Sequence, residues 1–393
     1  MLTQALSYDR GVEIPFIKPK RAQNESLYIN EALNSGSLQG GGEFSKWCSK
    51  WLQFNLGVDT AILTNSATDA LEMAAILLNI GPGDEVIMPS FTFSSSANAF
   101  VLRGATPVFI DVDSNTLNID ASLIEQAITS KTKALVVVHY AGVSGNLEQI
   151  ISICKKYNIF LVEDAAQAML AKSYDQYLGT FGQLACLSFH STKNIISGEG
   201  GALLINESSL VERAKVLLEK GTNREKYING EVDKYSWVDV GSSYLPSEVT
   251  AAYLKAQLED SRSITEYRLE NWNYYQNSFL NIAEKYSLGL TSVPSWSEHN
   301  AHIFYVTLPD IPLREIFIQQ MKQRNIQCTS HYIPLHNSLA GERYGRIGSN
   351  MSVTMSLSQQ LVRLPMWSER DLPKEDIFTA AEEVLLNMRI RDL

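Results

Sequence analysis

A lysine that could carry covalent chemistry lies in the segment Ser188-Phe189-His190-Ser191-Thr192-Lys193-Asn194, directly after an apolar run that predicts a strand. The stretch Gly198-Glu199-Gly200-Gly201 follows it. A lysine just past a strand end is compatible with Schiff-base formation, for which its amine must be deprotonated. Most loop lysines are solvated charges, but the hydroxyl-bearing and backbone-permissive neighbours here favour a site.

Two further segments place polar groups between a strand and the element that follows it. Val162-Glu163-Asp164-Ala165-Ala166-Gln167 puts two carboxylates at the carboxyl end of an apolar strand, where ligands bind in open α/β sheets. A buried carboxylate needs hydrogen bonds or a cationic partner, and a protonated pyridine nitrogen is one such partner. Thr64-Asn65-Ser66-Ala67-Thr68-Asp69 leads from a strand into a helix, so its free amides could bind a phosphate. An ordinary Ser or Asn helix cap is the alternative for this second turn.

The histidine-containing segment His331-Tyr332-Ile333-Pro334-Leu335-His336 suggests substrate contacts in a loop rather than a metal site. Its two histidines are five residues apart across a proline, and no cysteine or carboxylate completes a ligand set. Other catalytic signatures are absent: the sequence has no G-x-G-x-x-G after its first strand, no P-loop, no G-x-S-x-G and no H-E-x-x-H. A Rossmann dehydrogenase is therefore disfavoured, and no metal is expected.

The elements that position these segments alternate between apolar strands and helices. Several strands are apolar at every position, as expected when a parallel sheet is covered on both faces. This alternation predicts right-handed βαβ units in a three-layer α/β fold. The predicted strands are 60–64, 85–89, 107–110, 134–138, 159–163, 184–189 and 202–205, and the predicted helices are 67–79, 95–103, 121–129 and 147–157, with an amphipathic helix around residues 44–51 before the first strand.

The pattern changes near residue 245, where one or two long helices begin. Strands at 302–308 and 326–332 and helices at 313–324 and 374–389 follow. We therefore predict a large α/β domain with a mainly parallel sheet at residues 1–250. A helical connector and a smaller α/β domain would occupy residues 251–393.

Composition limits the function classes. Hydrophobic residues make up 45% of the 393 residues, charged residues 19%, and the net charge is −10. This is ordinary globular composition, and the acidic balance argues against a nucleic-acid-binding or anionic-membrane surface. No apolar run approaches the roughly 18 residues of a membrane span, and residues 1–16 show no signal peptide. The four cysteines are far apart, which favours free thiols in a reducing, cytoplasmic environment.

Taken together, six motifs resemble the DegT-type nucleotide-sugar aminotransferases, which are pyridoxal-phosphate enzymes of the aspartate-aminotransferase fold (fold type I). The motifs are N-S-A-T-D-A-L, P-S-F-T-F, V-E-D-A-A-Q, S-F-H-S-T-K-N, G-E-G-G and H-Y-I-P-L-H. Each is weak alone, but their order and spacing are specific, and the resemblance extends from Ile14 to the last helix.

The resemblance implies a role for each site residue. Lys193 would form the Schiff base and move the proton, Asp164 would pair with the pyridinium nitrogen, and Gln167 would bind the ring 3-hydroxyl. Sugar dehydratases of the same family carry histidine at the lysine position, so Lys193 favours amino transfer. The implied cofactor contacts are stacking by Phe93 and phosphate binding by Ala67, Thr68 and Ser188, and the implied substrate contacts are His331, Tyr332 and His336.

The resemblance also implies a homodimer with shared active sites. The segment Gly241-Ser242-Ser243-Tyr244-Leu245 matches a loop that reaches the partner's site, with Ser243 contacting the phosphate. Many family members have Asn and Arg where this chain has Ser243 and Leu245, a departure that bears on this contact.

Within the family, the stretches PGDEVIMPSFTF, ANAFVLRGA, VVVHYAGV, EKGTNR and GSSYL most resemble the branch that makes dTDP-4-amino-4,6-dideoxygalactose for cell-surface polysaccharides such as enterobacterial common antigen or O-antigen. The expected reaction moves an amino group from L-glutamate to the 4-keto carbon of dTDP-4-keto-6-deoxyglucose. The alternatives are amination of another nucleotide-linked keto-sugar (3-keto or UDP-linked) and a non-catalytic regulatory protein with the same fold.

Overall fold

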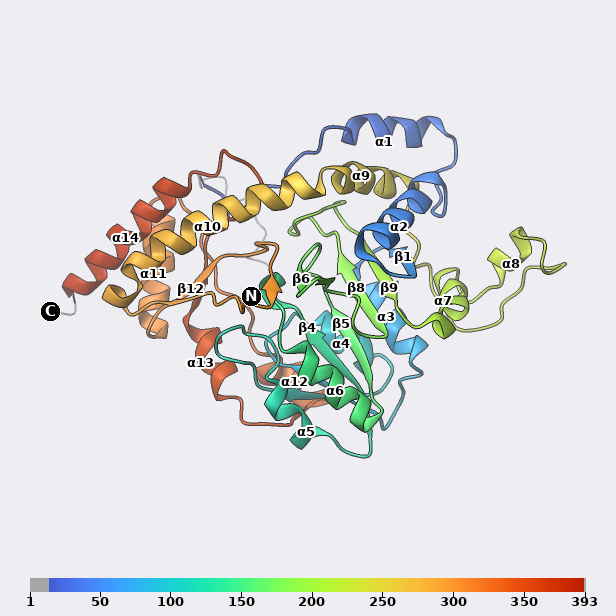
Figure 1. Cartoon of the computed structure of the whole chain (residues 1–393), viewed down its shortest axis with the longest axis horizontal. Coiled ribbons are helices and arrows are strands. Elements are labelled where there is room, and N and C mark those ends of the chain that lie inside the picture. The colour runs from blue at the N-terminus through green and yellow to red at the C-terminus, as the bar shows by residue number, and fades with distance from the viewer. Residues whose placement is uncertain (1–13, 392–393) are drawn as a thin grey trace.

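An eight-stranded, mainly parallel sheet lies at the centre of the computed structural model, which describes residues 14–391 (Figure 1). The strand order is β1-β9-β8-β5-β4-β2-β3-β13. The strands are β1 (Thr60–Thr64), β2 (Glu85–Pro89), β3 (Thr106–Ile110), β4 (Thr132–Val138), β5 (Phe160–Asp164), β8 (Leu184–Ser188), β9 (Gly201–Ile205) and β13 (Arg346–Ile347). The first seven agree with the predicted strands to within about two residues at each end.

Both faces of this sheet are buried, which explains why its strands are apolar at every position. In β2, Ile87 packs into the core on one face, whereas Val86 and Met88 pack into the core on the other. Helices cover both faces, so the predicted three-layer architecture is confirmed. The helices in this part of the chain are α1 (Glu25–Asn34), α2 (Glu43–Leu56), α3 (Ala67–Leu77), α4 (Ser95–Val101), α5 (Ile124–Ala127), α6 (Leu147–Tyr157), α7 (Val211–Leu218) and α8 (Arg224–Ile228), of which α1 packs on α9 and α8 extends beyond α7.

One strand departs from the βαβ pattern. β9 runs antiparallel to both of its neighbours, β1 and β8. No helix lies between β8 and β9, so the chain turns back through the loop at residues 189–200 instead of crossing over the sheet. That loop contains Lys193.

The C-terminal part builds a second core around a small antiparallel sheet in the order β10-β12-β14. Its long helices α10 and α14 pack together (Figure 1). The elements are α9 (Glu248–Glu259), α10 (Ser261–Tyr286), β10 (Gly289–Leu290), β12 (Tyr305–Thr307), α11 (Ile311–Gln323), α12 (Leu339–Tyr344), α13 (Ser352–Gln360), β14 (Leu361–Arg363) and α14 (Lys374–Arg391). A further small sheet joins β6 (Lys172–Ser173), β7 (Gln176–Tyr177) and β11 (Ser297–Glu298).

Two predictions in this part need correction. The strand predicted at 302–308 shortens to Tyr305–Thr307, and the one predicted at 326–332 makes only isolated bridges, from Ile326 to Ile14 and from Thr329 to Arg363. The second segment cannot continue as a strand because Tyr332 has a φ of +29°, in the left-handed region, shortly before Pro334.

Residues on both sides of the predicted domain boundary share a core. Ala251 and Leu254 of α9 pack into the core of the large sheet, and β13 returns from the C-terminal part to pair with β3. The two parts are thus in contact on both sides of residue 250, and the domain boundary placed there stays a prediction.

Three sequence-level expectations concern cysteines, membrane spans and the N-terminus. The four cysteines are free and buried in the structure. Within residues 14–391, no helix is long and apolar enough to cross a membrane. Most of residues 1–16, where no signal peptide is expected, lie outside the described residues, which begin at Ile14.

Candidate active site

Lys193 lies on the β8–β9 loop, partly buried, and its ammonium group has no hydrogen-bond or ion-pair partner among residues 14–391. Burial lowers the pKa of Lys193 to about 8, and the positive charge of Arg363 acts in the same direction while Asp164 opposes it. The structure therefore favours a lysine that is partly deprotonated at neutral pH, as a Schiff-base nucleophile requires.

Asp164 ends β5 and is almost fully buried. Its Oδ2 accepts a hydrogen bond of 2.6 Å from Ser96 Oγ, and its Oδ1 accepts one of 3.2 Å from the amide of Ala166. Ser96 is bonded in turn to Thr92 over 2.8 Å. A carboxylate offers about four acceptor positions, so Asp164 retains capacity for a protonated ring nitrogen.

Gln167 is held at both ends of its side-chain amide. Its Oε1 accepts a hydrogen bond of 2.7 Å from the amide of Ala141, and its Nε2 donates one of 2.9 Å to the hydroxyl of Tyr332. Ala141 has a φ of +61° and Tyr332 one of +29°, so both partners occupy strained backbone conformations of the kind that cluster at functional sites. Nε2 carries two hydrogens, which leaves one for a ligand such as the ring hydroxyl.

The turn before α3 has free amides of the kind that a phosphate site requires, and its role as that site stays a prediction. Ser66 caps the helix by accepting a hydrogen bond from the amide of Asp69, whereas the preceding amides of Ala67 and Thr68 have no partner among the described hydrogen bonds. A side chain at Gly201 would place its Cβ 2.3 Å from the carbonyl carbon of Ser66, so only glycine lets β9 pass this close to the helix start.

Ser188 and Phe93, the other two predicted cofactor contacts in the large domain, lie on segments that meet the site. Ser188 ends β8, five residues before the lysine, and is nearly buried. Phe93 is 58% exposed and lies three residues before Ser96, which contacts the carboxylate of Asp164. An aromatic ring that is left exposed beside such a site fits a stacking role, and this role stays a prediction.

The loop expected to reach a partner is anchored in its own chain. The carbonyl of Ser243 accepts a hydrogen bond of 3.0 Å from Asn65 Nδ2, and the carbonyl of Tyr244 accepts one of 2.9 Å from the amide of Asn65. Asn65 directly precedes the helix cap Ser66. The side chain of Ser243 is exposed, so its predicted role at a second site remains open to test.

The three predicted substrate residues divide into two environments. His331 and Tyr332 stack with their ring centroids 3.6 Å apart, and His331 Nδ1 forms a hydrogen bond of 2.8 Å with the hydroxyl of Tyr140. His336 is instead buried against the large sheet, where its Nδ1 bonds Ser90 Oγ over 2.7 Å. Burial lowers the pKa of both histidines below the ordinary value, which favours neutral rings. The substrate roles remain predictions.

The sequence did not point to a second network, which holds the lysine loop from the C-terminal part. Asn194 Oδ1 accepts a hydrogen bond of 2.9 Å from His302 Nδ1, and Asn194 Nδ2 donates to the carbonyl of Asn300 over 2.8 Å. Arg268 of α10 then donates to the carbonyls of Ala301 and His302. Ser96, Tyr140 and Arg268 lacked a sequence signal, because each acts through a contact made only in the folded chain.

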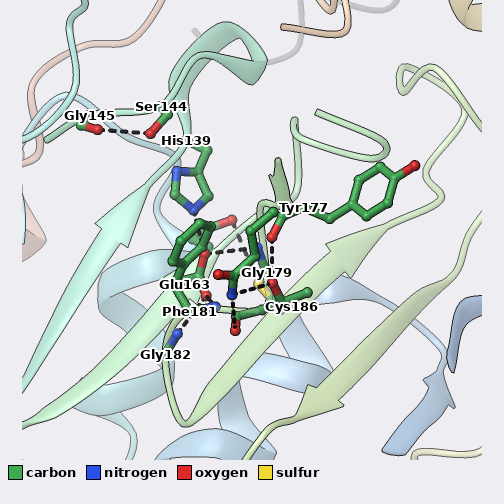
Figure 2. Close-up of polar contacts among 12 residues, drawn as sticks. His139, Ser144, Gly145, Glu163, Tyr177, Gly179, Phe181, Gly182 and Cys186 are labelled. Atoms are coloured by element: carbon green, nitrogen blue, oxygen red, sulfur yellow. Dashed lines mark hydrogen bonds and ion pairs between the residues drawn. The ribbon is translucent and has the colours of Figure 1, made fainter. Parts of the chain in front are cut away.

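The second carboxylate of the V-E-D segment, Glu163, is structural (Figure 2). It is fully buried and accepts hydrogen bonds of 2.7 to 2.8 Å from the amides of Gly179, Phe181 and Gly182. Its Oε2 also lies 2.8 Å from Nε2 of His139, whose amide donates to the carbonyl of Asp164. Glu163 therefore stabilises the turn beside the site.

The donor set fits pyridoxal phosphate. Free amides at a helix start suit a phosphate, a buried carboxylate suits the ring nitrogen, and an unpaired amine suits the aldehyde. Within residues 14–391, no three His, Cys, Asp or Glu side chains gather as metal ligands.

Comparisons with known proteins agree with this geometry. SpsC, a spore coat polysaccharide biosynthesis protein of Bacillus subtilis, is 28% identical over 386 residues, covering 95% of this chain and 97% of that protein. GDP-perosamine synthase of Escherichia coli O157:H7 is 34% identical over 273 residues, covering 69% and 72% of the two chains. The crystal structure of the aminotransferase TlmJ from Streptoalloteichus hindustanus superposes with a TM-score of 0.88 at 28% identity, covering 96% of this chain and all of that one.

A family model matches residues 19–384, nearly the whole chain. The protein therefore belongs to the DegT/DnrJ/EryC1/StrS aminotransferase family and is a sugar aminotransferase with pyridoxal phosphate as its cofactor.

Proposed function

We propose that this enzyme transfers the amino group of L-glutamate to C4 of dTDP-4-keto-6-deoxyglucose, giving dTDP-4-amino-4,6-dideoxygalactose for a cell-surface polysaccharide. The main support for amino transfer is Lys193, a partly buried amine with a pKa of about 8. It has no hydrogen-bond or ion-pair partner in the described part of the chain, and the carboxylate of Asp164 lies within its electrostatic reach. The choice of sugar rests on the sequence stretches that resemble this branch of the family. Relatives named for a polysaccharide pathway and for a GDP-linked sugar support the substrate class.

When bound, pyridoxal phosphate supplies an electron sink that allows an amino group to leave one substrate and enter another. The amides of Ala67 and Thr68, with Ser188, would hold the phosphate. Asp164, fixed by Ser96, would keep the ring nitrogen protonated, and Gln167 would orient the ring.

Lys193 would accept the proton from the donor carbon and return it in the second half-reaction. Its lowered pKa suits this task, because a general base works best with a pKa near the working pH. Alternating donor and acceptor at one site predicts ping-pong kinetics.

Two alternatives to this function are amination of a different keto-sugar and a non-catalytic, regulatory role. Amination of a 3-keto or UDP-linked sugar would use the same residues on another substrate. A non-catalytic regulatory protein would not need the proton-moving lysine, and the presence of Lys193, Asp164 and Gln167 together argues against it. A yellow protein bleached by glutamate would separate enzyme from regulator.

The deciding experiment incubates the enzyme with glutamate and dTDP-4-keto-6-deoxyglucose and identifies the product sugar by NMR. An axial amine at C4 supports the proposal. An equatorial C4 amine, or no product with this sugar while another keto-sugar reacts, would contradict the substrate assignment and leave the amino transfer intact.

We also propose a homodimer that shares its active sites. Figure 1 shows α8 standing out from the rest of the protein beyond α7. The segment around α8 exposes large apolar side chains, which is typical of a surface that packs against another protein chain. They are Tyr227, Ile228, Tyr235, Trp237 and Val238.

A mixed dimer tests the sharing. Lys193→Ala and Ser243→Trp should each be inactive alone. If Ser243 serves the partner's site, the mixed dimer carries both defects in one site and regains up to half of the wild-type activity from the other. Verified subunit exchange without any activity would contradict the sharing.

The free thiols and the nucleotide-sugar substrate support a cytoplasmic location.

A further inference from the structure

Asn300 is a buried residue that joins two segments of the site. It lies between β11 and β12 and is 1% exposed. Its Nδ2 donates hydrogen bonds of 2.9 Å to the carbonyls of Gln167 and Met169, in the segment after β5. Its own carbonyl accepts one of 2.8 Å from Asn194 Nδ2, in the loop after β8. One residue therefore connects Gln167 with the neighbour of Lys193.

The segment that follows a third strand, β4, leaves room for this side chain. Gly142 has a φ of +75°, and a Cβ there would lie 2.0 Å from Asn300 Oδ1, so a larger residue would displace the amide. The adjacent amide of Ala141 donates to Oε1 of Gln167, which fixes the side chain of that residue as well as its backbone. Strands β8, β5 and β4 are adjacent in the sheet, and Asn300 contacts the segments that follow all three.

Asn300 also belongs to a closed ring of hydrogen bonds with His302 and Asn194. The amide of His302 donates to Asn300 Oδ1 over 3.1 Å, and His302 Nδ1 donates to Asn194 Oδ1 over 2.9 Å. Burial lowers the pKa of His302 well below its ordinary value, which keeps the imidazole neutral. A flipped Asn300 amide would place its oxygen against two carbonyl oxygens, so only one orientation satisfies all partners.

We propose that Asn300 is a positioning residue that sets the distance between the amine of Lys193 and the side chain of Gln167. The inference rests on the roles proposed for these two residues at the cofactor. They lie on separate loops, and a displacement of about 1 Å at a reacting group can lower a rate roughly 100-fold. A buried amide with bonds to both loops prevents such a displacement.

The test measures how tightly the cofactor-free protein binds pyridoxal phosphate and pyridoxamine phosphate. Only the first has an aldehyde that can bond to Lys193, whereas both carry the phosphate and the ring hydroxyl. Asn300→Ala should therefore lose roughly tenfold more affinity for pyridoxal phosphate than for pyridoxamine phosphate. In the loaded enzyme, kcat should fall about 100-fold while the KM for glutamate changes less than about threefold, because the amine is no longer held in place.

Trace acetylation of Lys193 in the cofactor-free protein gives an independent readout. Burial is the main cause of the lowered pKa of Lys193, which is about 8. A looser loop admits water to the amine and favours the ammonium form. The acetylation midpoint should therefore be higher in Asn300→Ala than in wild type, and an unchanged midpoint would contradict the proposal.

A second variant tests whether the effect passes through Asn194. Asn194→Ala removes the bond to the carbonyl of Asn300 and should cause a similar selective loss of affinity for pyridoxal phosphate. The double variant should lose little more than the more affected single variant, because both changes break the same connection. Losses that multiply would mean that the two residues act independently, which would overturn the proposal.

Asn271→Ala is the matched control. Asn271 of α10 is also buried, and its Nδ2 donates hydrogen bonds of 3.1 Å to the carbonyls of Trp367 and Glu369, in the C-terminal part. Its loss should lower the urea midpoint about as much as Asn300→Ala does. The relative affinity for the two cofactor forms and the acetylation midpoint of Lys193 should stay at their wild-type values.

Two further results would overturn the proposal. Equal losses of affinity for both cofactor forms in Asn300→Ala would indicate a general structural role. The same selective loss in Asn271→Ala would indicate that any destabilised variant behaves in this way. Failure of the proposed function would appear in wild type instead: if borohydride did not fix the cofactor to Lys193, the role of the lysine would be wrong, and that of Asn300 with it.

Discussion

The lowered pKa of Lys193 can be measured directly on protein freed of its cofactor. Trace acetylation at a series of pH values, followed by mass spectrometry of the peptide that contains Lys193, reports the fraction of free amine at each pH. We expect a midpoint near pH 8, because burial and the charge of Arg363 disfavour the ammonium form. Nα-acetyl-lysine in the same tube gives the reference for an ordinary side chain.

The expected difference is large. With a pKa of about 8, roughly a tenth of the Lys193 amine is deprotonated at pH 7. With the ordinary value of about 10.4, roughly 0.04% would be deprotonated, which is a difference of more than 200-fold.

Two variants give the direction of the effect. Arg363→Gln should raise the midpoint, because it removes a repelling positive charge, and Asp164→Asn should lower it, because it removes an attracting negative one. A wild-type midpoint above pH 10, or shifts in the opposite directions, would refute the electrostatic account of Lys193.

Four further outcomes are expected. Lys193→Met should stabilise the cofactor-free protein at pH 7 by at most about 3 kcal/mol in urea unfolding, because the unfolded chain binds this proton more readily than the folded one, and the gain should vanish above about pH 10.5. Asp164→Asn should keep most of the yellow colour but lose turnover by orders of magnitude, and unchanged single-turnover rates would contradict its role. Ser96→Ala should lower turnover roughly tenfold, since a hydrogen bond to a charged group contributes about 1.5 kcal/mol or more, whereas the exposed Ser94→Ala should not. Glu163→Gln should destabilise the fold by about 2–4 kcal/mol, because its new NH₂ group faces hydrogen-bond donors, and an unchanged urea midpoint would contradict that account.

Much of the large sheet could be predicted from the sequence because its signals are local. Buried parallel strands are apolar at every position, and the helices between them carry caps such as Ser66. The antiparallel direction of β9 could not be predicted from such local signals, because it depends on the absence of a helix between β8 and β9. The segment 326–332 has a strand-like composition, but it meets its neighbours at single positions only.

The residues of the site also fall into two groups, those that could be predicted from the sequence and those that could not. Lys193, Asp164 and Gln167 could be found because each follows a strand end within a short motif. Ser96 and Arg363 could not, because their importance comes from contacts across long sequence separations. Ser96 reaches Asp164 across 68 positions. Arg363 belongs to no motif, and it stands out only because its buried Nε has no hydrogen-bond partner among residues 14–391.

The chain of contacts from Arg268 through His302 to Asn194 has a practical consequence for protein engineering. It ties the long helix α10 to the residue next to Lys193. A chimaera that exchanges the C-terminal part for that of a relative would therefore also alter the position of Lys193. Such exchanges should retain activity only when residues 268 to 302 are transplanted together with the 189–200 loop.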